Sequence, residues 1–248
     1  MGEREFRAYH EPFLGGASVF LGLPPFKKAF LGDANAELIA TFSTIRDHPT
    51  RVALQAGEYP NDEETYYEVR ASAPQGRIAR AARFLYLNHT SFNGIYRVNL
   101  DGVYNVPYGQ GRVAHIPAAS HLKHVATRLA NARLQVGDFQ ACLPMVEKGD
   151  LVFLDPPYTV AHNNNGFVKY NQRLFSFEDQ RRLSRLIDDL KARGAFYVLA
   201  NAAHQSILQL FDKGDALIET SRRNVIGGVN AQRGSATEYL FTNLTPNR

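Results

Sequence analysis

Residues 151–158, Leu-Val-Phe-Leu-Asp-Pro-Pro-Tyr, join a continuous apolar run to an abrupt polar, proline-rich end. Four consecutive apolar residues are typical of a parallel β-strand that is covered on both faces. Asp155, Pro156 and Tyr158 then stand at the carboxyl end of this strand, where open α/β sheets bind their ligands. The stretch therefore predicts a parallel α/β sheet with a ligand site at Asp155.

Strand-like and helix-like stretches alternate along much of the remaining chain. A capping box, Ser176-x-x-Asp179, opens a helical stripe that ends at Gly194. Strands that alternate with helices of this length are typical of an open, mostly parallel α/β sheet. The other helical stripes occupy 35–48 and 122–129, and the other candidate strands are 28–31, 195–200 and 238–242.

The pattern changes between about residues 51 and 134, where it becomes helical and basic. Nine arginine or lysine side chains and a single acid, Asp101, lie from Arg70 to Arg133, although the net charge of the whole chain is only +4. Such a cluster can be a solvated helix face, but the near absence of acids favours a surface for a polyanion. We therefore expect one domain formed by 1–50 and 134–248, with a nucleic-acid-binding domain, 51–133, inserted into it.

A β-hairpin is predicted inside this insertion. Asp101-Gly102 separates two alternating runs and is the usual signal for a two-residue type I′ turn. The register that follows pairs Arg97 with Val106 and Asn99 with Tyr104, which places all four side chains on one face. A two-stranded ribbon of this kind can enter the DNA major groove. From the pattern alone, a purely structural hairpin is equally compatible.

Composition limits the class of protein. The chain has 248 residues, of which 44% are hydrophobic and 21% charged, and this is ordinary for a globular fold. Cys142 is the single cysteine, so no internal disulfide can form. The charged amino terminus and the lack of any run of roughly 18 apolar residues argue against a secretion signal or a membrane span. We expect a cytoplasmic protein.

A second motif, Glu-Pro-Phe-Leu-Gly-Gly-Ala-Ser-Val-Phe at 11–20, precedes the candidate strand that ends near Asp33 and Asn35. Glycines at a strand-to-helix turn let the backbone approach a ligand closely, and the later acid is placed to accept hydrogen bonds from ribose hydroxyls. Two adjacent glycines without the full dinucleotide fingerprint are a weak signal alone. A plain turn remains the alternative.

The Asp155 stretch fits an exocyclic base amine. Such an amine offers two hydrogens and an aromatic face, and its delocalised lone pair makes it a poor nucleophile. A carboxylate and a carbonyl that accept both hydrogens favour the pyramidal nitrogen of the transition state, which is electrostatic preorganisation. The alternative is a strand-terminal turn with an incidental acid.

Both motifs, with the segment 80–109 between them, resemble the DNA adenine methylase (Dam) family, and especially its members that modify GATC. The similarity continues through Phe167, Tyr170 and the helix after Ser176 to Arg233-Gly234 and Glu238-Tyr239. It implies a Rossmann-like methyltransferase sheet with an inserted target-recognition domain. It also implies methyl transfer from S-adenosylmethionine to the 6-amino group of adenine in double-stranded DNA.

The resemblance also assigns roles to single residues. The catalytic set is Asp155, the Pro156 carbonyl and Tyr158, whose ring would stack on an adenine flipped out of the helix. Phe92 and Asn93 match residues that wedge into the duplex, and Arg97 suits a guanine's two major-groove acceptors. The cofactor set is Glu11, Pro12, Phe13, Gly15, Gly16, Ser18, Asp33, Asn35 and Asp155. The DNA-binding set is Phe92, Asn93, Arg97, Asn99, Pro107 and Tyr170.

One feature departs from the family pattern. Members usually begin with a segment containing a Trp-Ala-Gly-Gly-Lys-like stretch that closes over the cofactor. Here ten residues precede Glu11, and the chain has no tryptophan. Three explanations are compatible with this: a shortened chain, a partner chain that supplies the missing segment, or an open and weak cofactor pocket.

Other functions fit the sequence less well. Cytosine-5 methylation needs a Pro-Cys nucleophile, but Cys142 precedes Leu143-Pro144 and fits a core position. His121 and His124 lack a further ligand pair for a metal. The alternatives that remain are a catalytically impaired DNA-binding protein of the same fold, and an enzyme acting on the cytosine amine or on adenine in RNA.

Overall fold

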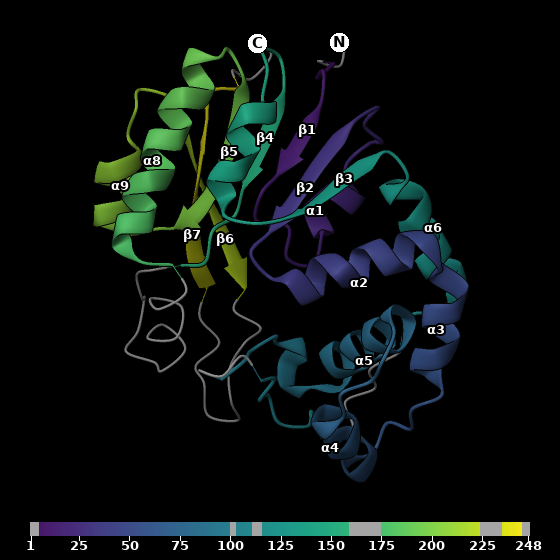
Figure 1. The fold of residues 1–248 in the computed structure, drawn as a ribbon. Coiled ribbons are helices and arrows are strands. Elements are labelled where there is room, and N and C mark those ends of the chain that lie inside the picture. The colour runs from purple at the N-terminus through teal and green to yellow at the C-terminus, as the bar shows by residue number, and fades with distance from the viewer. Residues whose placement is uncertain (1–4, 100–102, 111–115, 159–174, 224–234, 245–248) are drawn as a thin grey trace. The chain divides into compact units, whose positions relative to one another are not determined.

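The computed structural model describes residues 5–99, 103–110, 116–158, 175–223 and 235–244 (Figure 1). Its strands form one seven-stranded sheet in the order β3-β2-β1-β4-β5-β7-β6. β1 is parallel to β2 and β4, and β4 is parallel to β5, whereas β7 is antiparallel to both β5 and β6. This arrangement confirms the expected open, mostly parallel Rossmann-like sheet.

Four of these strands were predicted and three were not. The predicted apolar runs correspond to β2, β4, β5 and β7. The strands β1, β3 and β6 were not predicted, because they contain polar residues and do not form apolar runs in the sequence. The strands are β1 (Tyr9–Glu11), β2 (Ala29–Asp33), β3 (Ala132–Val136), β4 (Leu151–Leu154), β5 (Phe196–Ala202), β6 (Ala216–Arg223) and β7 (Ser235–Thr242).

The predicted helices are also present. Asn35 caps α2, because its Oδ1 accepts hydrogen bonds from the N–H groups of Glu37 and Leu38. The helices are α1 (Ser18–Gly22), α2 (Ala36–Asp47), α3 (Pro49–Gly57), α4 (Glu63–Ala71), α5 (Arg77–Thr90), α6 (Ala119–Leu129), α8 (Phe177–Ala192) and α9 (Gln205–Phe211), with 3-10 turns η1 (Phe92–Gly94) and η2 (Phe139–Met145). Among the described helices, none is both long and apolar enough to cross a bilayer.

The chain divides into two compact units. The first contains 1–20, 26–34 and 137–248, and the second contains 21–25 and 35–136. The division by function, with a catalytic domain of 1–50 and 134–248 and a recognition domain of 51–133, stays a prediction.

In the first unit, α8 supplies the main apolar face. The predicted capping box is present, since Ser176 and Asp179 exchange hydrogen bonds at its start. The apolar stripe of α8 is fully buried and packs with residues of β4 and β5, and α9 lies beside it (Figure 1). Burial of about four such side chains contributes on the order of 6–12 kcal/mol before the entropy of ordering is counted.

A buried polar cluster secures the short strand β1 to the turn before β4. The Asp150 carboxylate accepts hydrogen bonds from Arg7 Nε (2.8 Å) and Nη2 (2.9 Å) and from the Glu147 N–H (2.9 Å). It also lies 2.9 Å from His10 Nε2, and the side chains of Asp150 and His10 are both 0% exposed. Burial lowers the pKa of His10, so a neutral imidazole donates to Asp150 at neutral pH. This cluster joins residues 140 positions apart.

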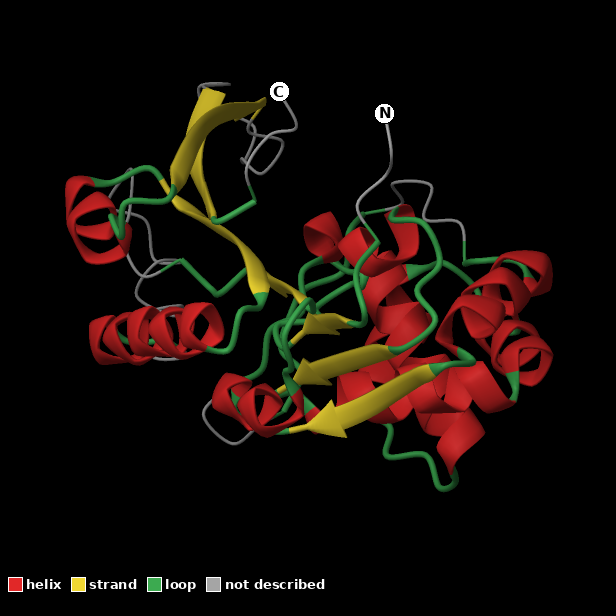
Figure 2. Ribbon diagram, turned by 90° about the horizontal axis from the view of Figure 1, so that it is seen from above, coloured by secondary structure: helices red, strands yellow, loops and turns green. Residues whose placement is uncertain are grey.

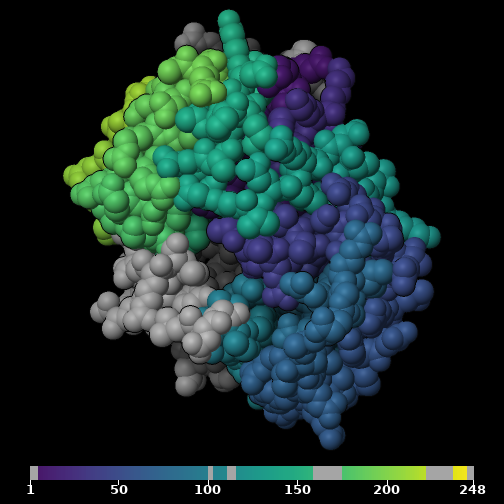
Figure 3. All heavy atoms as spheres, in the orientation of Figure 1, coloured from purple at the N-terminus to yellow at the C-terminus, as the bar shows by residue number. Residues whose placement is uncertain are grey.

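In the second unit, helices α2 to α6 pack on one another as a small bundle (Figure 2). Its core contains Tyr66, Tyr86 and Leu87, which are almost completely buried. Both tyrosine hydroxyls have partners, since Tyr66 donates to the Val106 carbonyl and Tyr86 to the Pro60 carbonyl. In the space-filling view, atoms of this bundle form a continuous surface on the face shown (Figure 3).

The hairpin register predicted from sequence is wrong by one residue. Val98 pairs with Tyr104 in an antiparallel bridge, and the Asn105 N–H donates to the Arg97 carbonyl (3.1 Å). Arg97 therefore lies opposite Asn105, where the prediction placed Val106. Asp101-Gly102, the predicted turn, lies outside the described residues.

The core of the second unit explains this register. Tyr104 and Val106 are buried there, so the face that carries them points into the bundle. Because side chains alternate along a strand, Arg97 and Asn99 lie on the opposite, outward face. The prediction placed all four residues on one face, and this is incorrect because the one-residue shift in register puts Tyr104 and Val106 on the buried face and Arg97 and Asn99 on the other.

Candidate functional site

Three acids stand at the carboxyl ends of adjacent parallel strands of the first unit. Glu11 is the last residue of β1, Asp33 is the last residue of β2, and Asp155 follows β4 directly. The sheet order places β1 between the other two strands. The fold thus brings these predicted site residues to one edge, where open α/β sheets bind ligands.

Asp33 holds the glycine turn in place. Its Oδ2 accepts a hydrogen bond from the Gly15 N–H (3.0 Å), and the Leu14 N–H donates to the Gly32 carbonyl (2.8 Å). Gly15 has φ of +47°, a backbone conformation that favours glycine. Gly15, Gly16 and Ser18 are exposed, so the turn presents its backbone to solvent.

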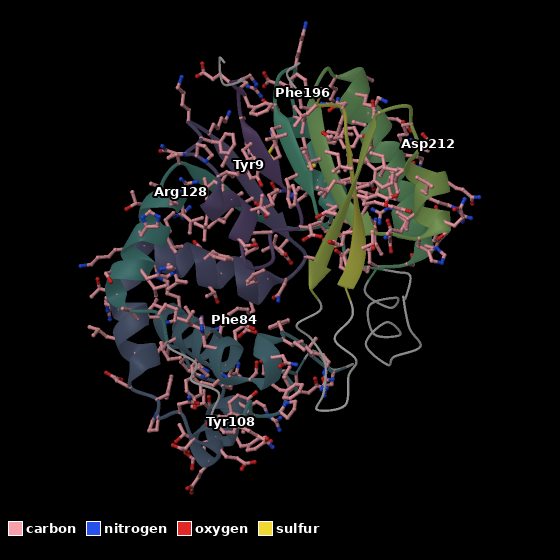
Figure 4. All side chains as sticks on the ribbon, turned by 180° about the vertical axis from the view of Figure 1, so that it is seen from behind. Tyr9, Phe84, Tyr108, Arg128, Phe196 and Asp212 are labelled. Carbon is pink, nitrogen blue, oxygen red and sulfur yellow. The ribbon has the colours of Figure 1, made fainter. Side chains whose placement is uncertain are left out.

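Glu11 is a buried carboxylic acid. It is 2% exposed, and its Oε2 accepts a hydrogen bond from the Tyr9 hydroxyl (2.8 Å). The ring of Tyr9, which is labelled in Figure 4, stacks with Phe20 and Phe26. Burial, with a smaller contribution from the charge of Asp155, raises the pKa of Glu11 to about 7, although the Tyr9 hydrogen bond lowers it. Glu11 can therefore gain or lose a proton near neutral pH.

The tetrapeptide after β4 presents its acid to solvent. Asp155 is exposed, whereas Pro156 is buried against the protein. The Tyr158 hydroxyl donates a hydrogen bond to Glu238 Oε1 on β7 (3.0 Å), which anchors the far end of the tetrapeptide. Two prolines and an anchored tyrosine make this a rigid segment with a carboxylate at its start.

Three phenylalanines form a cluster beside the predicted turn. Phe13 stacks on Phe139 with ring centroids 5.2 Å apart, and both rings contact Phe175. The Arg182 guanidinium lies over Phe139, 4.9 Å from its centroid, and Arg182 also pairs with Asp138 (2.8 Å). Sequence reasoning missed Phe139 and Phe175. The sequence signal that could have indicated a helical turn at Phe139 was Asp138, which directly precedes Phe139 and caps that turn.

In the second unit, the predicted wedge and hairpin residues come together. The Phe92 N–H donates to the Pro107 carbonyl (2.9 Å), and the Gly109 N–H donates to the Thr90 carbonyl (2.9 Å). Phe92 is 43% exposed, and Asn93 has a left-handed backbone with φ of +56°. An exposed aromatic ring on a tight turn that is fixed to the hairpin is suited to enter a base stack.

The basic side chains of the second unit divide into two groups. Some stabilise the unit itself, since Arg70 donates to the Val106 carbonyl and Arg83 to the Val69 carbonyl. Others are exposed, including Arg80 and Lys123. Part of the basic cluster seen in the sequence thus belongs to the packing of the bundle.

The remaining predicted residues lie as follows. Pro12 and Phe13 belong to the first unit, next to Glu11, whereas Asn35 belongs to the second unit as the cap of α2. Asn99 accepts a hydrogen bond from the Val103 N–H through Oδ1 (2.9 Å). Tyr170 lies outside the described residues.

Comparisons with known proteins agree with this geometry. Residues 3–226 match the family of D12 class N6 adenine-specific DNA methyltransferases. The type II methyltransferase M1.LlaDCHI of Lactococcus lactis subsp. cremoris is 33% identical over 250 residues, covering 96% of this chain and 87% of the relative. M.MjaIII of Methanocaldococcus jannaschii is 31% identical, covering 81% and 75%. The DNA adenine methylase of Escherichia coli strain K12 is 30% identical, covering 80% and 72%.

Proposed function

Because this chain belongs to the D12 class of N6 adenine-specific DNA methyltransferases, we propose that it methylates adenine in GATC sites of duplex DNA with S-adenosylmethionine as the donor. The observation that carries the proposal is the row of Glu11, Asp33 and Asp155 on three adjacent strand ends, beside an exposed glycine turn. The GATC site is supported by the family resemblance and by relatives named DNA adenine methylase.

The residues at this edge suit S-adenosylmethionine, which supplies a methyl group on a positively charged sulfonium. The Glu11 carboxyl, when ionised, suits the amino group of a cationic ligand in a buried position. Asp33, which already orients the Gly15 N–H, is placed to accept from ribose hydroxyls as well. Phe13 offers an aromatic face in the phenylalanine cluster.

Asp155 and Pro156 would act on the adenine amine. The carboxylate and the Pro156 carbonyl accept its two hydrogens, which favours the pyramidal nitrogen that attacks the methyl carbon. Formation of the new C–N bond would accompany cleavage of the bond between the methyl carbon and the sulfonium sulfur, with the electron pair left on sulfur. The nitrogen would lose a proton, and the Asp155 carboxylate is the proposed first acceptor. The Tyr158 ring, fixed through Glu238, supplies a stacking surface for the extruded base.

The second unit would bind the duplex. Phe92 and Asn93 would occupy the space left by the flipped adenine, while Arg97, Asn99 and Pro107 would face the bases of the site. The outward position of Arg97 on the hairpin supports this assignment, because the opposite face is buried.

Methyl transfer with labelled cofactor tests the proposal. Duplexes with one GATC site should accept methyl, and nuclease digestion with mass spectrometry should identify the product as N6-methyladenine. A duplex with GTTC in place of GATC should accept little. Binding of GATC duplexes without any methylation would instead support the catalytically impaired DNA-binding protein.

We expect Tyr9→Phe to move the pH midpoint of cofactor binding to a higher pH. The Tyr9 hydroxyl stabilises the Glu11 carboxylate, so its loss raises the pKa of Glu11 above about 7 and leaves more of the neutral acid at a given pH. Affinity for S-adenosylmethionine at pH 6.5 should fall by about 3- to 10-fold and recover at pH 8.5. Calorimetric titration across this pH range provides the measurement.

Tyr197→Phe is the matched control, because Tyr197 is also a buried tyrosine of the first unit whose hydroxyl donates to a carboxylate, that of Asp215 (2.8 Å). This variant should leave the pH midpoint unchanged. An unshifted midpoint in Tyr9→Phe would show that Glu11 does not set the pH dependence.

Arg97→Ala is expected to relax the choice of base at one position of the site. Loss of a bidentate arginine contact should reduce discrimination at that position by about 1–3 kcal/mol. Rates of methylation on GATC and on singly substituted duplexes measure this loss. Arg80→Ala, which removes an exposed arginine of α5, should change affinity for all sequences alike. Unchanged selectivity in Arg97→Ala would remove it from base recognition.

A further inference from the structure

Asn105 makes two hydrogen bonds to one edge of the Arg97 guanidinium. Arg97 Nε donates to Asn105 Oδ1 (2.8 Å), and Arg97 Nη2 donates to the Asn105 main-chain carbonyl (3.1 Å). The backbone bond between these residues, with Asn105 N–H on the Arg97 carbonyl, keeps them opposite each other. Two acceptors from one residue therefore fix both the position and the plane of the guanidinium.

Asn105 occupies one edge of the Arg97 guanidinium, and no other hydrogen bond to this group is made by the residues that the structure describes. A guanidinium has five N–H donors in a plane, and the bonds to Asn105 use Nε–H and one hydrogen of Nη2. The end of the group, formed by Nη1 and the other Nη2 hydrogen, remains a parallel fork. This fork has the geometry that matches the O6 and N7 acceptors of guanine.

We propose that Asn105 is a positioning residue for base recognition, which holds the Arg97 guanidinium so that its Nη1–Nη2 fork faces the duplex. The proposal rests on the proposed function, in which Arg97 reads a base. It adds that discrimination at the base read by Arg97 also depends on Asn105, which need not contact that base. A free arginine would have to lose rotamer entropy on binding, whereas Asn105 orders it beforehand.

The hairpin does not depend on this contact for its fold. Tyr104 and Val106 anchor the strand on the buried face, and the Tyr66 hydroxyl donates to the Val106 carbonyl (2.8 Å). The backbone bond between Asn105 and Arg97 needs no side chain. Substitution of Asn105 should thus leave the bundle folded while it frees Arg97 Nε.

The test compares methylation rates on GATC and on the duplex substituted at the position that Arg97→Ala identifies. Asn105→Ala and Asn105→Leu both remove the Oδ1 acceptor, and the leucine keeps the volume. Each should lower discrimination by about 3- to 10-fold, less than Arg97→Ala, because the main-chain carbonyl bond persists. The double variant Arg97→Ala/Asn105→Ala should discriminate like Arg97→Ala alone.

Two further variants separate positioning from a general disturbance. Asn105→Asp retains an acceptor for Nε, so it should restore discrimination even if repulsion from phosphates weakens binding to all duplexes. Val103→Ala changes an exposed residue of the same hairpin and should leave discrimination unchanged. Circular dichroism and thermal unfolding establish that each variant is folded.

The outcomes are distinct. Full discrimination in Asn105→Ala and Asn105→Leu, with loss in Arg97→Ala, would overturn the positioning role and leave the proposed function intact. Additive losses in the double variant would overturn it too, since they would mean that Asn105 acts independently of Arg97. If Arg97→Ala itself retains discrimination, base reading by Arg97 fails, and the positioning role fails with it.

Discussion

Replacing Asp155 by alanine is expected to lower the rate of methyl transfer by about 10²–10³-fold while DNA binding stays within a few-fold of its original strength. The expected size is that of removing one preorganised electrostatic group from a transition state. Asp155 is exposed at the end of β4, so its loss should cost little stability. Single-turnover transfer of labelled methyl measures the rate, and fluorescence anisotropy measures binding.

Two other variants test whether the carboxylate of Asp155 is responsible for the expected loss of rate. Asp155→Asn keeps the shape but replaces one acceptor oxygen by a donor, so the amine should meet a mismatched partner and the rate should fall almost as far. Asp212→Ala removes another exposed aspartate of the first unit, at the end of α9, and should leave the rate unchanged. Equal losses of transfer and DNA binding in Asp155→Ala would contradict a catalytic role.

Replacing Asp150 by alanine is expected to lower the free energy of unfolding by about 3 kcal/mol. The carboxylate is fully buried and accepts hydrogen bonds from Arg7, His10 and the Glu147 N–H. Its removal leaves these donors without their acceptor. The loss falls at the lower end of the range for a broken buried pair, because Arg7 is 37% exposed and can turn toward water. Urea-induced unfolding, followed by circular dichroism, provides the measurement.

Asp188→Ala is the matched control for stability. Asp188 forms an ion pair with Lys213 and is 60% exposed, so its loss should cost less than about 1 kcal/mol. Asp150→Asn should be nearly as destabilising as the alanine variant, because an amide donor would face the N–H donors around it. A change in Asp150→Ala no larger than that in Asp188→Ala would show that the cluster contributes little to the fold.

Local patterns in the sequence were enough to predict several helices and strands. The apolar run at 151–154 predicted β4, and the Ser176-x-x-Asp179 box predicted the start of α8. Both signals are local, because an apolar run and a capping box are each formed by residues within a few positions of one another. The positions of Asp33 and Asp155 at strand ends followed in the same way, because parallel strands share their carboxyl edge, whereas the strand that ends at Glu11 was not predicted.

The strand β1 shows why other elements could not be predicted. Its residues Tyr9, His10 and Glu11 all carry ionisable side chains, a composition that argues against a buried strand. They are buried because each has a partner, Tyr9 with Glu11 and His10 with Asp150. The second partner is 140 positions away in the chain, so no local pattern reveals it.

By itself, the sequence determined the class of sheet, the edge of the sheet that carries Asp33 and Asp155, and the basic helical segment, since all three follow from hydrophobic periodicity and composition. Only the tertiary structure decided the hairpin register, and with it the partner of Arg97. A turn signal such as Asp101-Gly102 specifies where the chain reverses, but the face that is buried is set by the bundle beneath it. Tyr104 and Val106 are buried in the bundle, and this burial sets the register of the described strands, because apolar burial over a whole strand contributes more free energy than a local turn preference.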